Sequence, residues 1–170
     1  KRVKEENFPV SIRLLRELHK ELMHEARGTQ FSDPGEFRKT QNWIGGTRPD
    51  NASFVPPPAD AILPALSDIE KFIHTDDTIP PAIKAGLVHA QFETIHPFLD
   101  GNGRTGRMLI MFCLWKSGTL ENPVLFLSSY FKKYQTVYYQ RLKKYHQGQI
   151  YPWLDFFLDG VVETANEAIS

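Results

Sequence analysis

Apolar residues recur at helical spacing in the first half of the chain, and three segments there predict amphipathic helices. The first runs from about residue 12 to near Gly28. The second is entered at Asp60, a residue type that can cap a helix N-terminus. The third begins at about Pro80 and stops at Pro97, because the residue before a proline disfavours helical geometry. This third helix therefore carries His96 at its C-terminal end.

The second half of the chain predicts three more helices. One begins near Gly103 and contains residues 108–115, which are apolar on nearly all sides, so we expect it to be a buried central helix surrounded by the others. The last two begin near Ser129 and Pro152 and carry aromatic residues on their inner faces. The expected fold class is all-α, a helical bundle around one central helix.

Residues 41–58, between the first two helices, interrupt the helical pattern. They include two adjacent glycines, a Pro-Asp-Asn turn signal and a run of three prolines. We expect a short hairpin here, with residues 42–47 running out and residues 53–55 running back.

The composition favours one compact domain over residues 1–170. At 170 residues and 41% hydrophobic content, the chain can bury about two thirds of its unfolded surface. A formal net charge of zero argues against a nucleic-acid or membrane-surface binder, and the apolar run 108–115 is shorter than the roughly 20 residues of a membrane span. The single cysteine, Cys113, fits a reducing cytoplasm. Because the chain opens at Lys1, we expect a fragment of a longer protein.

Residues 96–107, the motif segment, place a base, an acid, glycines and two arginines in one short connection between helices. Gly101 and Gly103 allow a sharp turn and a close backbone approach to a ligand. The next helix starts there, so its unpaired amide groups point back at the loop and favour an anion. Arg104 and Arg107 lie three residues apart, where they can fork onto phosphate oxygens. The motif segment therefore predicts a binding site for a di- or triphosphate.

Two further residues of the motif segment supply chemistry. His96 belongs to the residue type that titrates near neutral pH, so we expect it to be the general base toward an attacking hydroxyl. Asp100 is the candidate ligand for Mg²⁺, an ion that binds one or two carboxylates together with phosphate oxygens. Taken alone, each residue is more often a structural one, and a transition-metal site that includes His89 is a weaker alternative. Their combination in one segment favours catalysis.

The other histidines and the aromatic residues of the second half point to function less specifically. We expect His19, His24, His74 and His146 to lie at the surface. The aromatic series within residues 131–145 is interpreted first as core and second as a pocket for a nucleotide base.

The motif segment, HPFLDGNGRTGR, resembles the signature H-x-F-x-(D/E)-G-N-G-R-x-x-R of the Fic family and departs from it at no defined position. Residues on both sides of the expected hairpin are also similar to the family, among them Arg38 and Asn42. The resemblance covers about residues 8–165. It implies a Fic-type helical bundle in which residues 41–58 form a small β-hairpin flap.

The resemblance implies a protein adenylyltransferase, which transfers AMP from ATP to a Ser, Thr or Tyr hydroxyl of a target protein. His96 would deprotonate that hydroxyl, Phe98 would anchor the loop in the core, and Asp100 would hold Mg²⁺ between the α- and β-phosphates. Arg107 would hold the γ-phosphate, so that the α-phosphorus faces the attacking oxygen. The residues that the resemblance assigns to the nucleotide are Asp100, Gly101, Asn102, Gly103, Arg104, Thr105, Gly106, Arg107, Tyr138 and Tyr139.

The resemblance also assigns a target-binding role to the flap. Ile44, Gly45, Gly46 and Thr47 would form its side toward the active site, where an exposed strand edge pairs with the backbone of the target. Tyr138 and Tyr139 belong to the same implied site, as the residues that enclose the adenine.

Regulation and the transferred group have alternatives. Many Fic proteins carry an inhibitory helix with the motif (S/T)-x-x-x-E-(G/N), whose glutamate pairs with the second arginine. Residues 1–43 lack it, and the match at residues 117–122 falls in an expected loop, so inhibition would come from flanking sequence or a partner protein. Doc-like phosphorylation, UMP or phosphocholine transfer, AMP removal and nucleotide binding without turnover remain alternatives. A homodimer is equally open.

Overall fold

The structure, a computed structural model, describes residues 9–25, 33–121 and 127–169. In these ranges it contains seven α-helices: α2 (Ile12–Glu25), α3 (Ile62–His74), α4 (Pro81–Ile95), α5 (Asn102–Lys116), α6 (Leu127–Lys133), α7 (Gln135–His146) and α8 (Ile150–Ile169). Two short 3₁₀ helices, η1 (Pro49–Asn51) and η2 (Ala59–Ala61), lie between α2 and α3. Among the described helices, none offers the length and hydrophobicity needed to cross a membrane.

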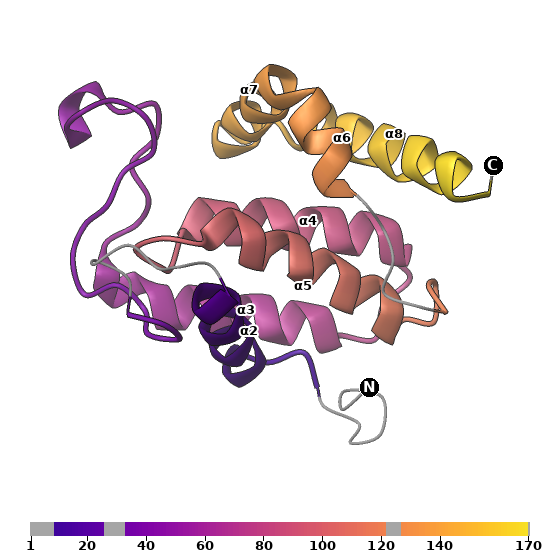
Figure 1. Ribbon diagram of the computed structural model, residues 1–170, viewed down its shortest axis with the longest axis horizontal. Helices are drawn as coiled ribbons and strands as arrows, with labels where there is room; N and C mark the ends of the chain where they lie inside the picture. The colour runs from indigo at the N-terminus through magenta and orange to yellow at the C-terminus, as the bar shows by residue number, and fades with distance from the viewer. Residues whose placement is uncertain (1–8, 26–32, 122–126, 170) are drawn as a thin grey trace.

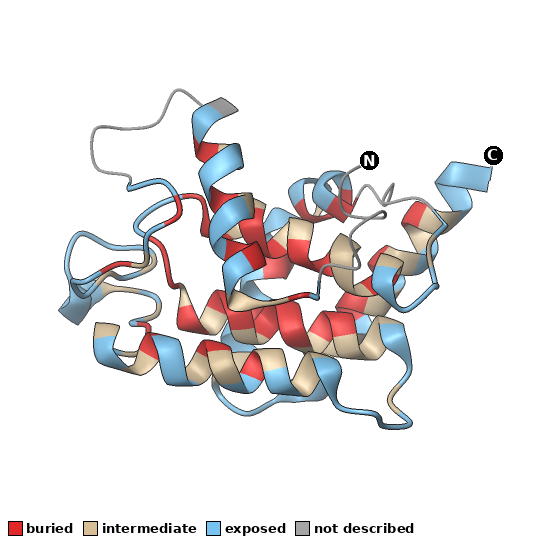
Figure 2. Cartoon of the chain, turned by 90° about the horizontal axis from the view of Figure 1, so that it is seen from below, coloured by how far each residue is buried: buried red, intermediate tan, exposed pale blue. Residues whose placement is uncertain are grey.

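Helices α4 and α5 lie side by side at the centre of the molecule (Figure 1). Helices α2 and α3 pack on one side of this pair, and α6, α7 and α8 lie on the other side. The buried residues concentrate along the central helices (Figure 2), which explains why the sequence of α5 shows no single polar face. The all-α prediction is confirmed, and the helix expected at the centre, α5, shares that place with α4.

Two clusters of buried side chains form the core on either side of the central pair. The first joins α4 and α5 to α6, α7 and α8, and it includes Phe131, Tyr138 and Trp153. The indole Nε1 of Trp153 donates a hydrogen bond to the carbonyl oxygen of Gly86 at 2.9 Å. The second cluster joins the central pair to α2 and α3 and includes Phe98 of the motif segment, which is 0% exposed. The motif segment is therefore built into the core on the α2 side.

The start of α3 differs from the prediction, because Asp60 does not cap it. Asp60 lies inside η2, and α3 starts at Ile62 with Ala61 in the N-cap position and no side-chain cap bond. Ala61 and Ile62 already have right-handed helical backbone angles, so η2 runs directly into α3 without an extended capping residue. The expected end of the first helix, near Gly28, lies outside the described residues.

The single helix predicted from Ser129 is wrong, because the structure has two helices there, α6 and α7. The backbone leaves helical geometry at Tyr134, where φ is −110° and ψ is 38°. The rings of Phe131 and Tyr138, from the two sides of this break, stack with centroids 4.6 Å apart, so both enter the core. Helix α8 begins before the expected Pro152, which fits within its first turn.

Residues 41–58, the flap loop, project away from the helices (Figure 1). Its two arms meet at one antiparallel bridge, where the N–H of Ile44 donates to the carbonyl oxygen of Phe54 at 2.9 Å. Within the described ranges no longer strand occurs, so the expected hairpin is reduced to this bridge. Pairing stops there because Gly45 and Gly46 both have φ of 69°, a left-handed geometry that strands do not use.

Candidate active site

Residues 96–101, the connecting loop, join α4 to α5 at one end of the central pair. His96 is the C-cap of α4 and has φ of 49° and ψ of 61°. In the described part of the chain it is the one non-glycine residue with a positive φ. This left-handed turn, followed by Pro97, ends the helix and directs the chain toward α5. A side chain in that region costs energy, so neighbouring groups must hold it.

The buried side chain of Arg38 holds the end of α4. Its Nε donates to the carbonyl oxygen of His96 at 2.8 Å, and its Nη2 donates to those of Ile95 at 3.2 Å and Pro57 at 2.6 Å. Its Nη1 donates to the carbonyl oxygen of Thr40 at 3.0 Å. A cation at a helix C-terminus is also favoured by the helix dipole. Arg38 therefore supports the turn at His96 and ties it to the base of the flap loop.

The rest of the connecting loop is held through further backbone groups. Asn102 accepts a hydrogen bond from the N–H of Phe98 at 2.9 Å and donates one to its carbonyl oxygen at 2.7 Å. Asn42 of the flap loop donates to the same carbonyl oxygen at 3.2 Å. His19 of α2 bonds the carbonyl oxygen of Asp100 at 2.8 Å. Side chains from other parts of the fold thus bond several carbonyl groups of the connecting loop and fix its backbone.

Helix α5 starts immediately after Gly101, its N-cap, which has φ of 79°. The carbonyl oxygen of Gly101 accepts hydrogen bonds from the N–H of Thr105 at 3.0 Å and from its hydroxyl at 2.9 Å. Oδ1 of Asp100 accepts a bond from the N–H of Gly101 at 2.6 Å. The first amides of a helix have no partner within that helix, so the start of α5 can bind an anion.

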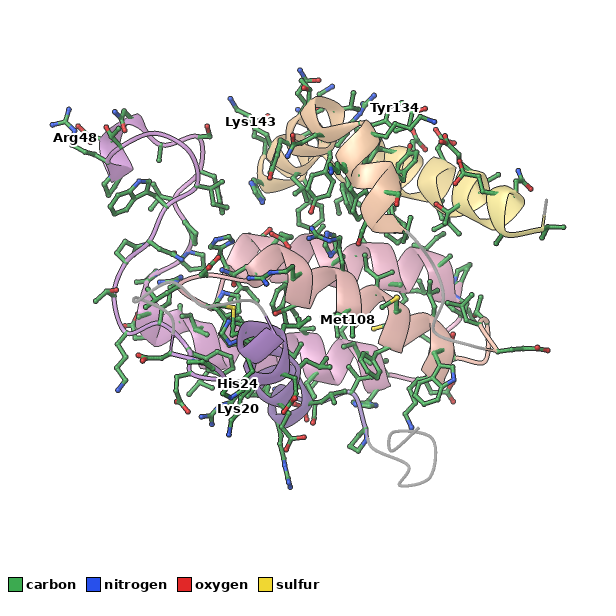
Figure 3. All side chains as sticks on the ribbon, viewed as in Figure 1. Lys20, His24, Arg48, Met108, Tyr134 and Lys143 are labelled. Atoms are coloured by element: carbon green, nitrogen blue, oxygen red, sulfur yellow. The ribbon has the colours of Figure 1, made fainter. Side chains whose placement is uncertain are left out.

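A cavity of about 610 Å³ lies between the motif segment, the flap loop and α7. Cavities of this size hold small molecules. Its lining residues are Ile44, Gly45, Ser53, Phe54, Glu93, His96, Gly103, Arg107, Tyr138, Tyr139, Gln140, Leu142, Lys143 and His146. Figure 3 shows Lys143 on the side of α7 that is nearer to the flap loop, whose tip carries Arg48. The cavity therefore brings the expected base together with some of the residues expected to bind the nucleotide, to enclose the adenine and to form the flap.

Some of the expected site residues lie outside the lining of this cavity. Arg104 borders a second cavity of about 170 Å³, which Arg107 also lines, and its Nη2 is 3.4 Å from Sδ of Met23. Asp100 is exposed at the end of the connecting loop. Gly46 and Thr47 are exposed at the outer part of the flap loop. The expected set is therefore divided between two neighbouring cavities and the surface next to them.

Four members of the expected nucleotide set are buried inside the motif segment, namely Gly101, Asn102, Thr105 and Gly106. Asn102 and Thr105 bond the backbone of the segment, as described above. A Cβ at Gly106 would stand 2.7 Å from Oε1 of Glu93 and 3.1 Å from Cδ1 of Phe92, so only glycine allows α4 and α5 to approach this closely. These buried residues hold the shape of the motif segment.

The imidazole of His96 is held in its neutral form. Burial, reinforced by the charge of Arg38, lowers the pKa of its imidazole to about 4. The side chain is still 20% exposed and lines the cavity. The residue type titrates near neutral pH, and the surroundings lower the pKa of this imidazole because they disfavour the charged form. The imidazole is neutral at pH 7, as a general base must be before it acts.

Glu93 is a cavity residue that the sequence analysis missed. It is 7% exposed, and its Oε2 lies 4.0 Å from Nδ1 of His96. Burial raises the pKa of Glu93 to about 7, although the charge of Arg107 acts in the opposite direction. Across the described residues, Oε1 of Glu93 and Nδ1 of His96 are among the buried atoms without a hydrogen-bond partner. The spacing could have revealed Glu93, because it precedes His96 by one helical turn.

The expectation that four histidines lie at the surface is wrong for two of them, His19 and His146. His19 is 1% exposed. His146 is partly buried and stacks on Phe54 of the flap loop with ring centroids 3.8 Å apart. His74 is exposed, as expected, and bonds the carbonyl oxygen of Val10 at 2.7 Å. His24 is exposed, as expected.

His89 takes part in core packing instead of a metal site. Its Nε2 lies 2.9 Å from the hydroxyl oxygen of Tyr138, and burial lowers the pKa of its imidazole to about 4. Over the described ranges, no group of three or more His, Cys, Asp or Glu side chains is arranged to hold a metal ion. Tyr138 is 5% exposed and Tyr139 is 54% exposed, so the first belongs to the core as well as to the cavity wall.

Residues 9–114 match a family profile that is described as the Fic/DOC family. The protein adenylyltransferase Fic of Drosophila erecta is 32% identical over 164 residues, which cover 94% of this chain and 29% of that protein. The protein of the same name from Drosophila melanogaster is 31% identical over 164 residues, with 94% and 30% covered. The chain thus spans less than a third of the length of these curated relatives.

Solved structures show the same fold. A Fic family protein from Desulfovibrio desulfuricans G20 superposes with a TM-score of 0.76 at 26% identity, covering 93% of this chain and 46% of that one. The BepC protein from Bartonella tribocorum, solved with bound AMPPNP, gives a TM-score of 0.63 at 22% identity, covering 88% and 73%. The second likeness supports the fold alone.

Proposed function

Since the chain belongs to the Fic/DOC family, we propose that it transfers AMP from ATP to a Ser, Thr or Tyr hydroxyl of a target protein. The observation that carries this proposal is one cavity lined by the neutral imidazole of His96, by Gly103 at the start of α5 and by Arg107. A base beside groups that bind phosphate is what transfer to a hydroxyl requires. The names of the Drosophila relatives, protein adenylyltransferases, support the same activity.

The proposed step forms one bond and breaks one. His96 accepts the proton of the target hydroxyl while the hydroxyl oxygen bonds to the α-phosphorus of ATP. The bond from the α-phosphorus to the oxygen that bridges to the β-phosphate breaks, and pyrophosphate leaves. Arg107 and the first amides of α5 hold the phosphates so that the α-phosphorus, not the γ-phosphorus, lies beside His96. Positioning and charge stabilisation supply most of the catalysis in such reactions.

Asp100 is the residue that would hold Mg²⁺. It is exposed, and it accepts the bond from Gly101 through Oδ1, which leaves Oδ2 for an ion. One carboxylate together with phosphate oxygens and water is an ordinary donor set for Mg²⁺, so the residues present fit the ion. When bound, the ion would neutralise negative charge on the phosphates.

The two ends of the cavity are assigned to the adenine and to the target. Tyr138 and Tyr139 of α7 border the cavity and are proposed to enclose the adenine. Ile44 and Gly45 line it from the flap loop and are proposed to pair with the target backbone, an edge that residues 46–47 extend.

Regulation is proposed to come from outside the described residues, through flanking sequence or a partner protein. The motif-like residues 117–122 follow α5, whose length of about 22 Å separates them from the expected phosphate site. Gly118 has φ of 76° in a turn, as expected of a loop, and Asn122 lies outside the described residues. The free thiol of Cys113 suits a reducing cytoplasm, which is the location we propose.

Radiolabelled ATP tests the proposal. The protein is incubated with Mg²⁺, a lysate as the source of targets, and ATP labelled at either the α- or the γ-phosphate. AMP transfer predicts that the added chain increases protein-bound label from α-labelled ATP only, relative to the same lysate without the chain. An increase from γ-labelled ATP would indicate a kinase of the Doc type, and no increase from either would indicate nucleotide binding without turnover. Either result would contradict the proposal.

A further inference from the structure

We infer that His19 of α2 is a positioning residue for the phosphate site and acts through the carbonyl group of Asp100. The inference rests on the proposed function, because it concerns the same site. His19 is not among the residues that line the cavity, so it acts from behind the connecting loop.

Hydrogen bonds at two edges of the imidazole fix its orientation and tautomer. The N–H of Gly35 donates to Nδ1 of His19 at 2.8 Å, so Nδ1 carries no proton. In a neutral ring Nε2 must then carry the proton, and it donates to the carbonyl oxygen of Asp100, also at 2.8 Å. His19 therefore bridges two segments that are far apart in sequence.

The ring also packs directly against the connecting loop. It is stacked on Phe98 with centroids 3.7 Å apart and an interplanar angle of 0°. A Cβ at Gly101 would stand 3.3 Å from Nε2 of His19 and 2.9 Å from Sδ of Met23, so the loop backbone rests on these two side chains of α2. Because His19 is 1% exposed, neither the ring nor the loop can shift without the other.

The hydrogen bond to Asp100 falls at a sensitive place in the site. Asp100 carries the carboxylate proposed to hold Mg²⁺, and the next residue, Gly101, is the N-cap of α5. Arg38 and Asn42 hold the connecting loop before this point, and His19 holds it here. A misplacement of about 1 Å can cost on the order of 100-fold in rate, so loss of this contact should reduce turnover.

Two substitutions separate the two hydrogen bonds of the ring. His19→Gln places an N–H donor where Nε2 stands, so it can still bond Asp100 but not accept from Gly35. His19→Asn places an oxygen acceptor where Nδ1 stands, so it can still accept from Gly35 but cannot reach Asp100. Both lose one hydrogen bond and the stack on Phe98, so similar losses of thermal stability are expected. His24→Gln, exposed on the same helix, is the control.

Turnover with α-labelled ATP gives the first readout. We expect His19→Gln to lose less than about 5-fold in kcat, and His19→Asn to lose about 10- to 100-fold and to need more Mg²⁺ for half-maximal rate. Equal losses in the two variants, or a larger loss in His19→Gln, would reduce His19 to a structural residue and overturn the inference.

Amide hydrogen exchange without nucleotide gives the second readout, and it does not depend on activity. The amides of Gly101 and Thr105 are hydrogen-bonded in the wild type, and we expect them to exchange faster in His19→Asn than in His19→Gln. Equal exchange would overturn the inference. A wild-type chain that transfers no label would refute the proposed function, whereas the exchange comparison would still decide the role of His19.

Discussion

The connecting loop and the flap loop border the same cavity but are held in different ways. Side chains that bond the backbone of the connecting loop and the end of α4 come from several parts of the chain: His19, Arg38, Asn42 and Asn102. In the outer part of the flap loop, a bridge between Ile44 and Phe54 joins the two arms, and Asn51 bonds the backbone of the tip. The stack of Phe54 on His146 connects this part to α7. The connecting loop, which forms one wall of the cavity, is therefore fixed at many points, and the flap loop, which forms another wall, is fixed at few.

If the chain transfers AMP as proposed, this difference suits its two substrates. The nucleotide phosphates are the same in every reaction cycle, so a preorganised wall would stabilise the transition state without being rearranged. A protein target presents a polypeptide segment, which a lightly held edge can accept by main-chain pairing. The following substitutions act on one wall at a time, or on the link between the two.

His96→Asn is expected to have the largest effect, because it removes the proposed base from the fixed wall. Asparagine tolerates the left-handed backbone that His96 adopts, so the loop should keep its shape. We expect transfer of α-label to fall about 1,000-fold. Affinity for AMPPNP, measured by calorimetry, should change by less than about 2-fold. Retained transfer would exclude His96 as the base, and lost nucleotide binding would make its role structural.

Arg38→Leu should break the link between the two walls. It removes the donors for four carbonyl groups, from the end of α4 to the base of the flap loop. We expect the free energy of unfolding, measured with urea, to fall by about 4 kcal/mol. The control Arg48→Leu, at the exposed tip of the flap loop, should change it by less than about 0.5 kcal/mol. Equal small effects would show that Arg38 does not support the site.

Glu93→Gln tests the burial of a carboxyl group in the fixed wall. The pKa of Glu93 is raised to about 7, so its protonated form favours folding: this contribution is present below about pH 4.5 and is lost as the pH rises through 7. The glutamine of the variant does not titrate, so the variant keeps its stability as the pH rises. We expect the free energy of unfolding of the variant, relative to that of the wild type, to rise between pH 5 and 8, by roughly 3 kcal/mol at pH 8. A difference that stays constant with pH would contradict the raised pKa.

Gly46→Ala is expected to have the smallest effect, because it alters only the lightly held wall. Gly46 has φ of 69°, and a Cβ there would collide with the carbonyl oxygen of Asn51. We expect kcat/KM for the target protein to fall by about 10-fold, with unchanged affinity for AMPPNP. Gly118→Ala shares the positive φ but meets nothing within 4 Å at the far end of α5, so it controls for backbone strain alone. A loss of nucleotide affinity in Gly46→Ala would show that the two walls are not separate.

The sequence predicted the motif segment and the type of most helices, because these depend on local residue order. Pro97 after His96 and glycine at 101 determine where α4 ends and α5 starts. The residues that support the segment were predicted less well. The apolar pattern of α2 placed His19 at the surface, whereas its partners, Gly35 and Asp100, come from segments 16 and 81 residues away. No local sequence pattern predicts such long-range contacts.

The remaining errors have the same tertiary origin. The break at Tyr134 depends on how α6 and α7 pack against α8, which helical periodicity does not contain. The flap loop carries the residue types of a hairpin, yet the paired backbone shortens to one bridge because two glycines and a 3₁₀ turn form its tip. The low pKa of His96 comes from burial and from Arg38, a residue 58 positions away.

The most direct test of a phosphate site beside His96 is a crystal structure of the chain with AMPPNP and Mg²⁺. We predict that the nucleotide lies in the cavity with its α-phosphorus nearest to the imidazole and its γ-phosphate at Arg107. A nucleotide bound outside the cavity, or bound in reverse with the γ-phosphorus beside His96, would contradict AMP transfer by this chain.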